Sequence, residues 1–446
     1  MIILLIATSI VGLVSGLLLT YRYAVLFPYV LVGYIGVYYI FSYDFSLKFG
    51  GINVYGWDLL IAFAVVNIFI RLSTDGVSVG KGARMLIFGL FSYVLWLEFS
   101  EFVRFFSDSN MGFDNLIRTS VVSLYPLVAL SIVLSCDEKQ FKNFMWFVVM
   151  VAIAASIGLV VKEVLDIGAF KTSSGTIRRG KGEMTVLLHI GMALLLFQKK
   201  LSPMARYPGV LILLIGVALL GHRSSFVGTA VLLMVFLIFT LRGNVDTHKA
   251  IFLVPMGAFS SVLLIAFIIF SEIPAVESFR TRLIDTVDTE NQTSVGRLQK
   301  WTVAMRSVKE NPLGGTKLNS LPDYYGRYLA EADFGRFNIS EAHGAYIYLG
   351  EATPWPPHNM FINILSRNGI IGLGCFLMVV LGTFLTSFSR DVRTKTCIFA
   401  IIASNFIFLA LNNHHHYATL AILFVFLVSM PIRLRMLYGE ELCKKK

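Results

Sequence analysis

Charged residues are scarce in this sequence of 446 residues. Asp, Glu, Lys and Arg make up 15% of it, whereas soluble domains carry about a quarter of such residues. The deficit excludes an ordinary water-exposed surface, and 56% of the residues are hydrophobic instead. The sequence also lacks a Gly-rich nucleotide loop, a Walker motif and a recognisable pair of catalytic carboxylates, so it gives no sign of nucleotide-sugar chemistry.

Cysteine is rare as well, with four residues at positions 136, 375, 397 and 443. None of them lies in the long segment 272–358, so we expect no disulfide to staple that segment. Three adjacent histidines, His414 to His416, have no Cys or carboxylate at metal-ligand spacing. We therefore expect neither a metal site nor a cofactor.

What the sequence does have is long apolar runs, each close to the roughly 20 residues that cross a membrane as a helix. In lipid every backbone polar group must be satisfied internally, so runs this long and numerous predict a helical bundle. We predict an all-α polytopic membrane protein with about 12–13 transmembrane helices. The expected spans are 2–20, 24–42, 57–72, 85–106, 117–135, 141–161, 184–198, 207–221, 224–241, 250–271, 359–388, 396–411 and 417–430. Because the N-terminus lacks a basic region and a cleavage site, we interpret it as a retained first span.

The formal net charge of +11 would by itself suggest a nucleic-acid partner, but the positions of the charges argue against one. Most Lys and Arg residues lie in short connections and in the C-terminal tail, which the positive-inside rule places in the cytoplasm. The alternate connections, among them 162–183 and 272–358, are then periplasmic. We expect a multi-pass protein of the bacterial inner membrane with its active site on the periplasmic side. If this orientation and thirteen spans both hold, the N-terminus lies outside. If the N-terminus lies inside, one early pair of spans is misassigned.

The connection 272–358 is long, at about 87 residues, and loops of that length without a function are uncommon. It divides the chain into an N-terminal helix bundle (1–271), a large, partly helical periplasmic loop (272–358), and C-terminal helices with a basic tail (359–446). Aromatic residues in the loop suit sugar binding, because rings stack on the C–H faces of sugars; the alternative is an interfacial belt or a small loop core. The candidates are Trp301, Tyr324, Tyr325 and Trp355.

Basic or nitrogen-bearing groups also gather at the predicted outer corners: Arg178 and Arg179, His222 and Arg223, Arg297, and His358 and Asn359. A guanidinium beside glycine suits phosphate binding, and an Arg as close to hydrocarbon as Arg223 is a functional candidate by default. His358 lies where a helix begins, a place where a histidine can act as a general base. Taken singly, each group also fits a solvated charge, a surface ion pair or a structural histidine.

The motifs resemble the superfamily of O-antigen ligases and O-antigen polymerases, enzymes of bacterial envelope polysaccharides, over about residues 175–385. Gly221 to Ser225 is similar to the family's short Ser-Arg turn, with His222 where Ser is common. Arg297 to Trp301, followed by Pro312-Leu313-Gly314-Gly315, resembles its Arg-x3-Trp and Pro-Leu-x-Gly stretch. His358-Asn359 with Gly369 and Gly372 is similar to its His-Asn-x9-Gly-x2-Gly signature.

The resemblance implies a GT-C-like, metal-independent glycosyltransferase whose donor is an oligosaccharide on undecaprenyl pyrophosphate. Arg178 or Arg179, Arg223 and Arg297 would neutralise the pyrophosphate, and His358, beside Asn359, would deprotonate the acceptor. Membrane lipids and a chain-length regulator are the further partners that it implies.

The acceptor stays open at this point. We favour a polymerase of O-antigen or exopolysaccharide repeat units, because such polymerases are numerous; a ligase acting on lipid A-core and a protein-directed transferase are alternatives. From other classes, a glycolipid flippase or transporter would show broken helices and two similar halves. A structural assembly partner would use the outer loop for docking.

Overall fold

The structure is a computed structural model of the full chain, and its description covers part of the residues. The described residues are 26–41, 46–49, 52–74, 81–107, 113, 116, 120, 123–135, 137–167, 170–171, 177–178, 182–198, 201–242, 301, 304–315, 359–386, 392–411 and 423. The predicted spans 2–20, 250–271 and 417–430 lie outside them, apart from Leu423.

Helices dominate the described residues, which confirms the predicted fold class. The first half contains α2 (Phe27–Phe41), α3 (Gly56–Thr74), α4 (Lys81–Ser107), the short 3-10 helix η1 (Tyr125–Leu127), α6 (Val128–Ser135) and α7 (Glu138–Val164). The second half contains α8 (Met184–Phe197), α9 (Pro203–Leu220), α10 (Arg223–Arg242), α16 (Met360–Thr386) and α17 (Val392–Leu411). Within the described ranges, six helices are long and apolar enough to cross a membrane, namely α4, α7, α9, α10, α16 and α17.

Two short antiparallel hairpins interrupt this helical pattern. Strand β1 (Ser46–Phe49) pairs with β2 (Ile52–Tyr55), and β3 (Phe170–Lys171) pairs with β4 (Ile177–Arg178). We did not predict these strands, because strands of two to four residues leave no periodic signal in a mostly apolar sequence. Both hairpins fall in connections that the charge pattern places outside the membrane.

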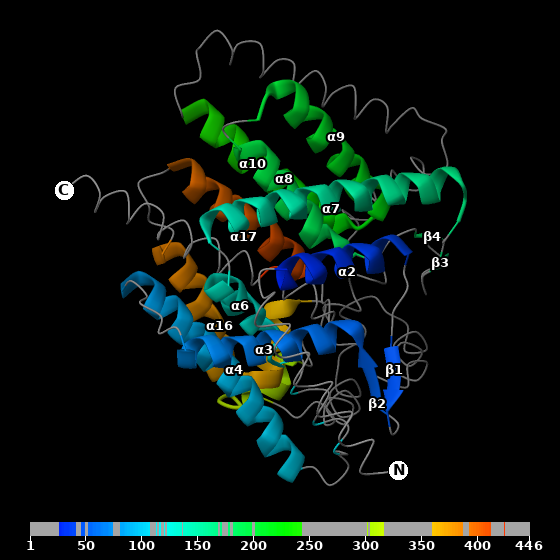
Figure 1. Ribbon diagram of the computed structural model, residues 1–446. Helices are drawn as coiled ribbons and strands as arrows, with labels where there is room; N and C mark the ends of the chain where they lie inside the picture. The colour runs from blue at the N-terminus through cyan, green and yellow to red at the C-terminus, as the bar shows by residue number, and fades with distance from the viewer. Residues whose placement is uncertain are drawn as a thin grey trace, which may run out of the picture.

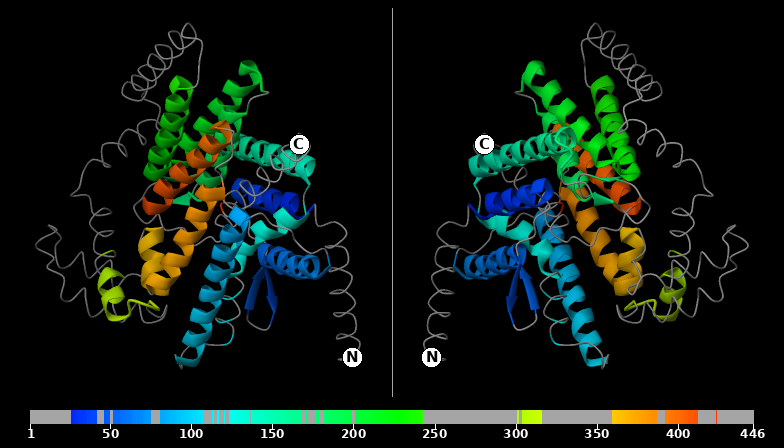
Figure 2. Two further views of the ribbon diagram at one scale, coloured as in Figure 1. Left: turned by 90° about the vertical axis from the view of Figure 1, so that its left-hand side faces the viewer. Right: turned by 90° about the vertical axis from the view of Figure 1, so that its right-hand side faces the viewer.

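The helices pack as a bundle with two well-defined pairs. Helix α4 lies along α16, and α10 lies along α17, as Figures 1 and 2 show. Helix α7 packs against α2, α8 and α9, while α8 also contacts α17. Through these contacts α8 becomes a central helix, with all but one of its residues buried.

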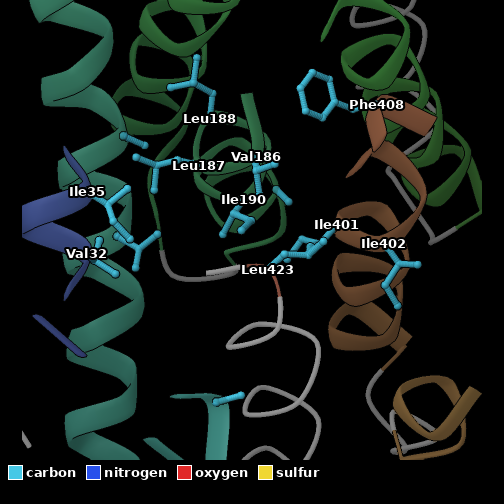
Figure 3. Close-up of a cluster of buried hydrophobic side chains, with 14 of the residues drawn as sticks. Val32, Ile35, Val186, Leu187, Leu188, Ile190, Ile401, Ile402, Phe408 and Leu423 are labelled. Atoms are coloured by element: carbon cyan, nitrogen blue, oxygen red, sulfur yellow. The ribbon is translucent and has the colours of Figure 1, made fainter. Parts of the chain in front are cut away.

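A continuous apolar core fills the space between these helices. Figure 3 shows one cluster of it, in which side chains of α2, such as Ile35, lie near residues of α8 and of α17. Ile35 and Leu188 are fully buried, and Ile401 is nearly so. Side chains as apolar as lipid tails give helices little hydrophobic reason to associate, so close packing and hydrogen bonds must hold the bundle together.

Local sequence signals explain several helix ends. Asp137 and Gln140 form a capping box at the start of α7, in which each side chain accepts a hydrogen bond from the other residue's backbone N–H. Helix α9 ends at Gly221, whose positive φ of 63° puts the chain in the left-handed conformation typical of glycine. These ends matter for function because Gly221 leads directly into the His222–Arg223 corner.

Candidate functional site

The predicted site residues fall unevenly on the described part of the chain. Trp301 and Asn359 are described in full, whereas Arg178 in β4 and Arg223 at the start of α10 are described only in their backbone. The other candidates lie outside the described residues: Arg179, Arg297, Tyr324, Tyr325, Trp355 and His358. We therefore build the site from the elements that carry these residues.

The first corner of the site is the junction of the loop before α8 with the turn between α9 and α10. His222 is 8% exposed and lies directly against Gly182. A Cβ on Gly182 would lie 2.6 Å from Nε2 of His222, so a side chain at residue 182 would force the His222 ring to move. The structure thus brings the end of the segment that carries Arg178 and Arg179 against the residue preceding Arg223.

The turn itself is short, because only Gly221 and His222 separate α9 from α10. Gly221 donates its N–H to Ala218 O at 3.1 Å and closes α9, and α10 begins two residues later, at Arg223. Ser225 N already donates to His222 O at 3.0 Å. Arg223 is therefore the first residue of α10, beside backbone N–H groups that have no partner within the helix, an arrangement that favours anions.

A buried polar group joins α8 to α10 beneath this corner. Thr185 Oγ1 and Ser225 Oγ share a hydrogen bond of 2.6 Å, and both residues are fully buried. One turn further, Nε2 of His189 lies 3.0 Å from Thr229 Oγ1 and 3.3 Å from Ser225 O. Polar groups in an apolar interior need such partners. The pairs fix the first two turns of α10 on α8, and with them the position of Arg223.

Sequence reasoning missed this group and its neighbour Glu183, which is 6% exposed at the start of α8. A signal was present, because an ionisable residue such as His189 inside a predicted span is a functional candidate by default. Asn405 of α17 is also buried, donates to Ile401 O at 2.8 Å, and interacts with the His189 ring. The polar group thus reaches a third helix.

The second corner is the start of α16. Asn359 is its N-cap, since its Oδ1 accepts hydrogen bonds from Phe361 N at 2.9 Å and Ile362 N at 3.0 Å. The amide oxygen is therefore occupied by the helix, and only the amide nitrogen of Asn359 is left for a substrate. The cap also fixes the point at which α16 begins, one residue after Asn359.

The glycines downstream of Asn359 have a structural explanation that the sequence alone did not provide. Helix α16 is broken at Gly369, where φ is 66° and ψ is −171°. The turn Pro312–Gly315 of the outer segment fits into this break, and Ile370 N donates to Pro312 O at 2.8 Å. A Cβ on Gly369 would collide with the backbone of Leu313, and one on Gly315 with the backbone of Arg367.

This docking fixes the outer segment to α16 at one point. Residues 304–310, just before the turn, are helical, and they lie beside the start of α16, as the yellow-green and gold segments of Figure 2 show. Trp301 is half-buried, and its indole Nε1 has no hydrogen-bond partner among the described residues. An indole N–H of this kind can donate a hydrogen bond to a sugar hydroxyl, while the predicted stacking of Trp301 on a sugar stays a prediction.

Helix α4 contacts the same break from the opposite side. Trp96 Nε1 donates to Asn368 O at 2.8 Å, the carbonyl just before the break. The Trp96 ring also covers Gly372, where a Cβ would lie 3.1 Å from the indole. The sequence offered no hint of this contact, because 272 residues separate the two partners.

Comparison with known families now places these motifs. Residues 208–377 match the family model described as O-antigen ligase. This part of the chain is an O-antigen ligase family domain. The match confirms the resemblance inferred from the motifs, and it spans the His222–Arg223 corner, the segment 272–358 and α16 as far as Leu377. No curated protein matches the chain.

The match supports a membrane glycosyltransferase of the O-antigen ligase or polymerase type. A multi-pass helical fold fits this class. Helix α4 and the loop with Arg178 lie outside the matched residues. Both contact the matched part, α4 through Trp96 and Asn368, and the end of the loop through Gly182 and His222. In the part of the chain that the structure describes, no group of three or more His, Cys, Asp or Glu side chains is arranged to hold a metal ion. The side chains that these corners offer are cations, amides and an indole.

Proposed function

We propose that this protein is a glycosyltransferase that acts at the periplasmic face on glycans linked to undecaprenyl pyrophosphate, and that it polymerises O-antigen or exopolysaccharide repeat units. The observation that carries the proposal is the contact of Gly182 with His222. It joins the loop with Arg178 and Arg179 to the start of α10 with Arg223, within and beside an O-antigen ligase family domain.

The chemistry follows from the donor. An acceptor hydroxyl attacks the anomeric carbon, a new C–O bond forms, and the bond to the pyrophosphate breaks with its electron pair leaving on the lipid pyrophosphate. Arg178, Arg179, Arg223 and Arg297 are assigned to bind that anion, because guanidinium groups bind phosphate oxygens in pairs. The acceptor proton passes to His358. No metal is required, since charge neutralisation by arginine and positioning supply the stabilisation.

Two alternatives remain, a ligase and a transporter. Transfer to lipid A-core would use the same donor chemistry, so no described residue separates a ligase from a polymerase. A flippase is favoured by one observation, the break in α16 at Gly369, because transporters bind substrates at broken helices. Here the Pro312–Gly315 turn occupies that break, which favours a structural role for it.

The test is a transfer assay with purified protein in lipid nanodiscs. Lipid-linked repeat units are supplied alone and then with lipid A-core, and products are resolved by size. Elongation without core supports the polymerase, and product only with core identifies a ligase. Absence of transfer under both conditions, with movement of a labelled glycolipid across liposomes, would overturn the proposal in favour of a flippase.

Variants test the assigned residues in the same assay. We expect Arg223→Ala, Arg297→Ala and His358→Ala each to lower the rate by about 10²–10³-fold, the usual loss when one contact to a developing charge is removed. The matched control is Arg84→Ala. Arg84 is an exposed arginine in the first turn of α4, and we expect its substitution to leave the rate unchanged. Wild-type rates in the three site variants would contradict the assignment.

A further inference from the structure

Trp96 is the residue through which a helix outside the matched domain reaches into it. The indole donates to Asn368 O at 2.8 Å and covers Gly372, both within residues 208–377, while α4 itself lies outside that range. The contact lies in the half of α16 that leads to Asn359, nine residues before Asn368.

Helices α4 and α16 are packed too closely to slide independently. A Cβ on Gly89 of α4 would lie 3.2 Å from Val379 N, and one on Gly382 of α16 would lie 2.9 Å from Leu86 Cα. Backbones therefore touch at two points in the cytoplasmic half of the pair, as small residues allow in membrane helices. Trp96 is the third point and the one nearest the outer surface.

The bond to Asn368 O has a specific task because α16 is broken at the next residue. A carbonyl beside a break loses its regular partner within the helix, and a buried carbonyl without a partner is unfavourable. Trp96 supplies that partner. On the other side of the break, Ile370 N donates to Pro312 O, so both backbone groups next to Gly369 have partners from outside α16.

We propose that Trp96 is a positioning residue for the transfer reaction, an inference that rests on the proposed function. By holding Asn368 O it keeps the break open in the shape that receives the Pro312–Gly315 turn. The turn is the fixed point between the two parts of the outer segment, one leading back to Trp301 and Arg297 and the other forward to His358 and Asn359. Trp96 thereby holds the turn that follows Trp301 in place against the helix that begins after Asn359.

This role predicts an effect on the rate and not on donor binding. The described contacts of Trp96 with α16 are to Asn368 and Gly372, neither of which is assigned to the pyrophosphate, so KM for the lipid-linked donor should change less than about twofold. Misplacing reacting groups by about an ångström can cost on the order of 10²-fold in rate. We expect Trp96→Phe, which keeps an aromatic ring but removes the N–H donor, to lower kcat about 10–100-fold.

The experiment combines kinetics with hydrogen exchange on the full-length protein in nanodiscs. In Trp96→Phe, peptides that contain the Ile370 amide and the 311–315 turn should exchange faster than in the wild type. Trp96→His, which restores a ring N–H donor, should recover part of both kcat and protection. Trp146→Phe is the matched control, since this tryptophan is 37% exposed on α7.

A second variant approaches the same contact from α16. Gly372→Ala pushes a methyl group against both partners of the contact, the Asn368 side chain and the Trp96 ring, and should change kcat and exchange in the same direction as Trp96→Phe. Gly374→Ala, two residues further along, meets nothing within 4 Å and should change neither. This pair keeps the inference testable if Trp96→Phe fails to fold.

Unchanged exchange at Ile370 in Trp96→Phe and Gly372→Ala would overturn the inference, and so would faster exchange with a wild-type kcat. A raised KM with an unchanged kcat would also overturn it, because that result assigns Trp96 to donor binding. A wild-type protein without any transfer activity would instead sink the proposed function, and the inference with it. The two failures are therefore distinguishable.

Discussion

The two corners of the candidate site are held in different ways. Along α4 and α16, the pair that leads to one corner, backbone approaches backbone at Gly89 and Gly382, and the Trp96 indole closes the contact. At the α8–α10 corner, side chains make the connection through hydrogen bonds, with Thr185 bonded to Ser225 and His189 near Thr229.

The difference shows the two means by which helices associate in lipid, close packing through small residues and interhelical hydrogen bonds. A glycine contact tolerates no added atom, because neither backbone can move aside. A hydrogen-bonded pair that loses one member loses the bond and leaves one buried polar group to find another partner, but the packing stays largely intact. The α4–α16 contact should therefore be the more sensitive to single substitutions, and the hydrogen-bonded α8–α10 contact the less sensitive.

The largest effect should come from Gly369→Ala. Its φ and ψ lie in a region that is essentially restricted to glycine, where another residue costs about 1–3 kcal/mol. The new methyl group would also collide with the Leu313 backbone, and overpacking costs about 1–3 kcal/mol more. We expect the free energy of unfolding to fall by about 3 kcal/mol, measured by thermal or denaturant unfolding in detergent.

Gly374→Ala is the control for this substitution, since a Cβ there meets nothing within 4 Å. Stability close to the wild type is expected for it, because it adds the same methyl group to the same helix in open space. Equal stability of the two variants would show that the turn does not fill the break in α16.

An intermediate effect should follow from Gly228→Ala in α10. Its Cβ would lie 2.7 Å from Ser404 O of α17 and 2.5 Å from Cε1 of His189. The imidazole can shift but the carbonyl cannot, so we expect a loss of about 1–3 kcal/mol by the same unfolding measurement. Gly33→Ala in α2 is the control, because its nearest neighbour, Phe147 Cζ, would lie at an ordinary 3.6 Å. A larger loss in Gly33→Ala than in Gly228→Ala would contradict the packing argument.

Most of the fold in the described residues followed from the sequence, because apolar length is a strong signal. The predicted spans 141–161 and 224–241 correspond to α7 (Glu138–Val164) and α10 (Arg223–Arg242). The span predicted at 117–135 corresponds to the shorter α6 (Val128–Ser135) with η1 before it. Pro126 lies within η1, where it suits a tight first turn.

The site was less predictable, because its residues are joined by contacts that are distant in sequence. The motifs correctly marked Gly369 and Gly372, but a sequence does not show that one receives a turn and the other a tryptophan. The sequence predicted Asn359 as the neighbour of the base His358. It did not show that Asn359 caps α16, because that role depends on the residue at which the helix begins. Trp96 gave no pattern at all, since a single aromatic residue inside an apolar run acquires a role only when helices pack. His189 did give a signal, as an ionisable residue inside a predicted span, but its partners are distant in sequence.

The smallest effect should come from the hydrogen-bonded corner, and a double-mutant cycle measures it. Thr185→Val and Ser225→Ala each remove one hydroxyl of the 2.6 Å pair and nearly preserve the packing. Coupling energies for such pairs between membrane helices average about 0.6 kcal/mol and reach about 1.7 kcal/mol. We expect a coupling in this range from the unfolding free energies of the two single variants and the double variant. A coupling as large as the loss in Gly369→Ala would reverse the comparison and make the hydrogen-bonded corner the more rigid one.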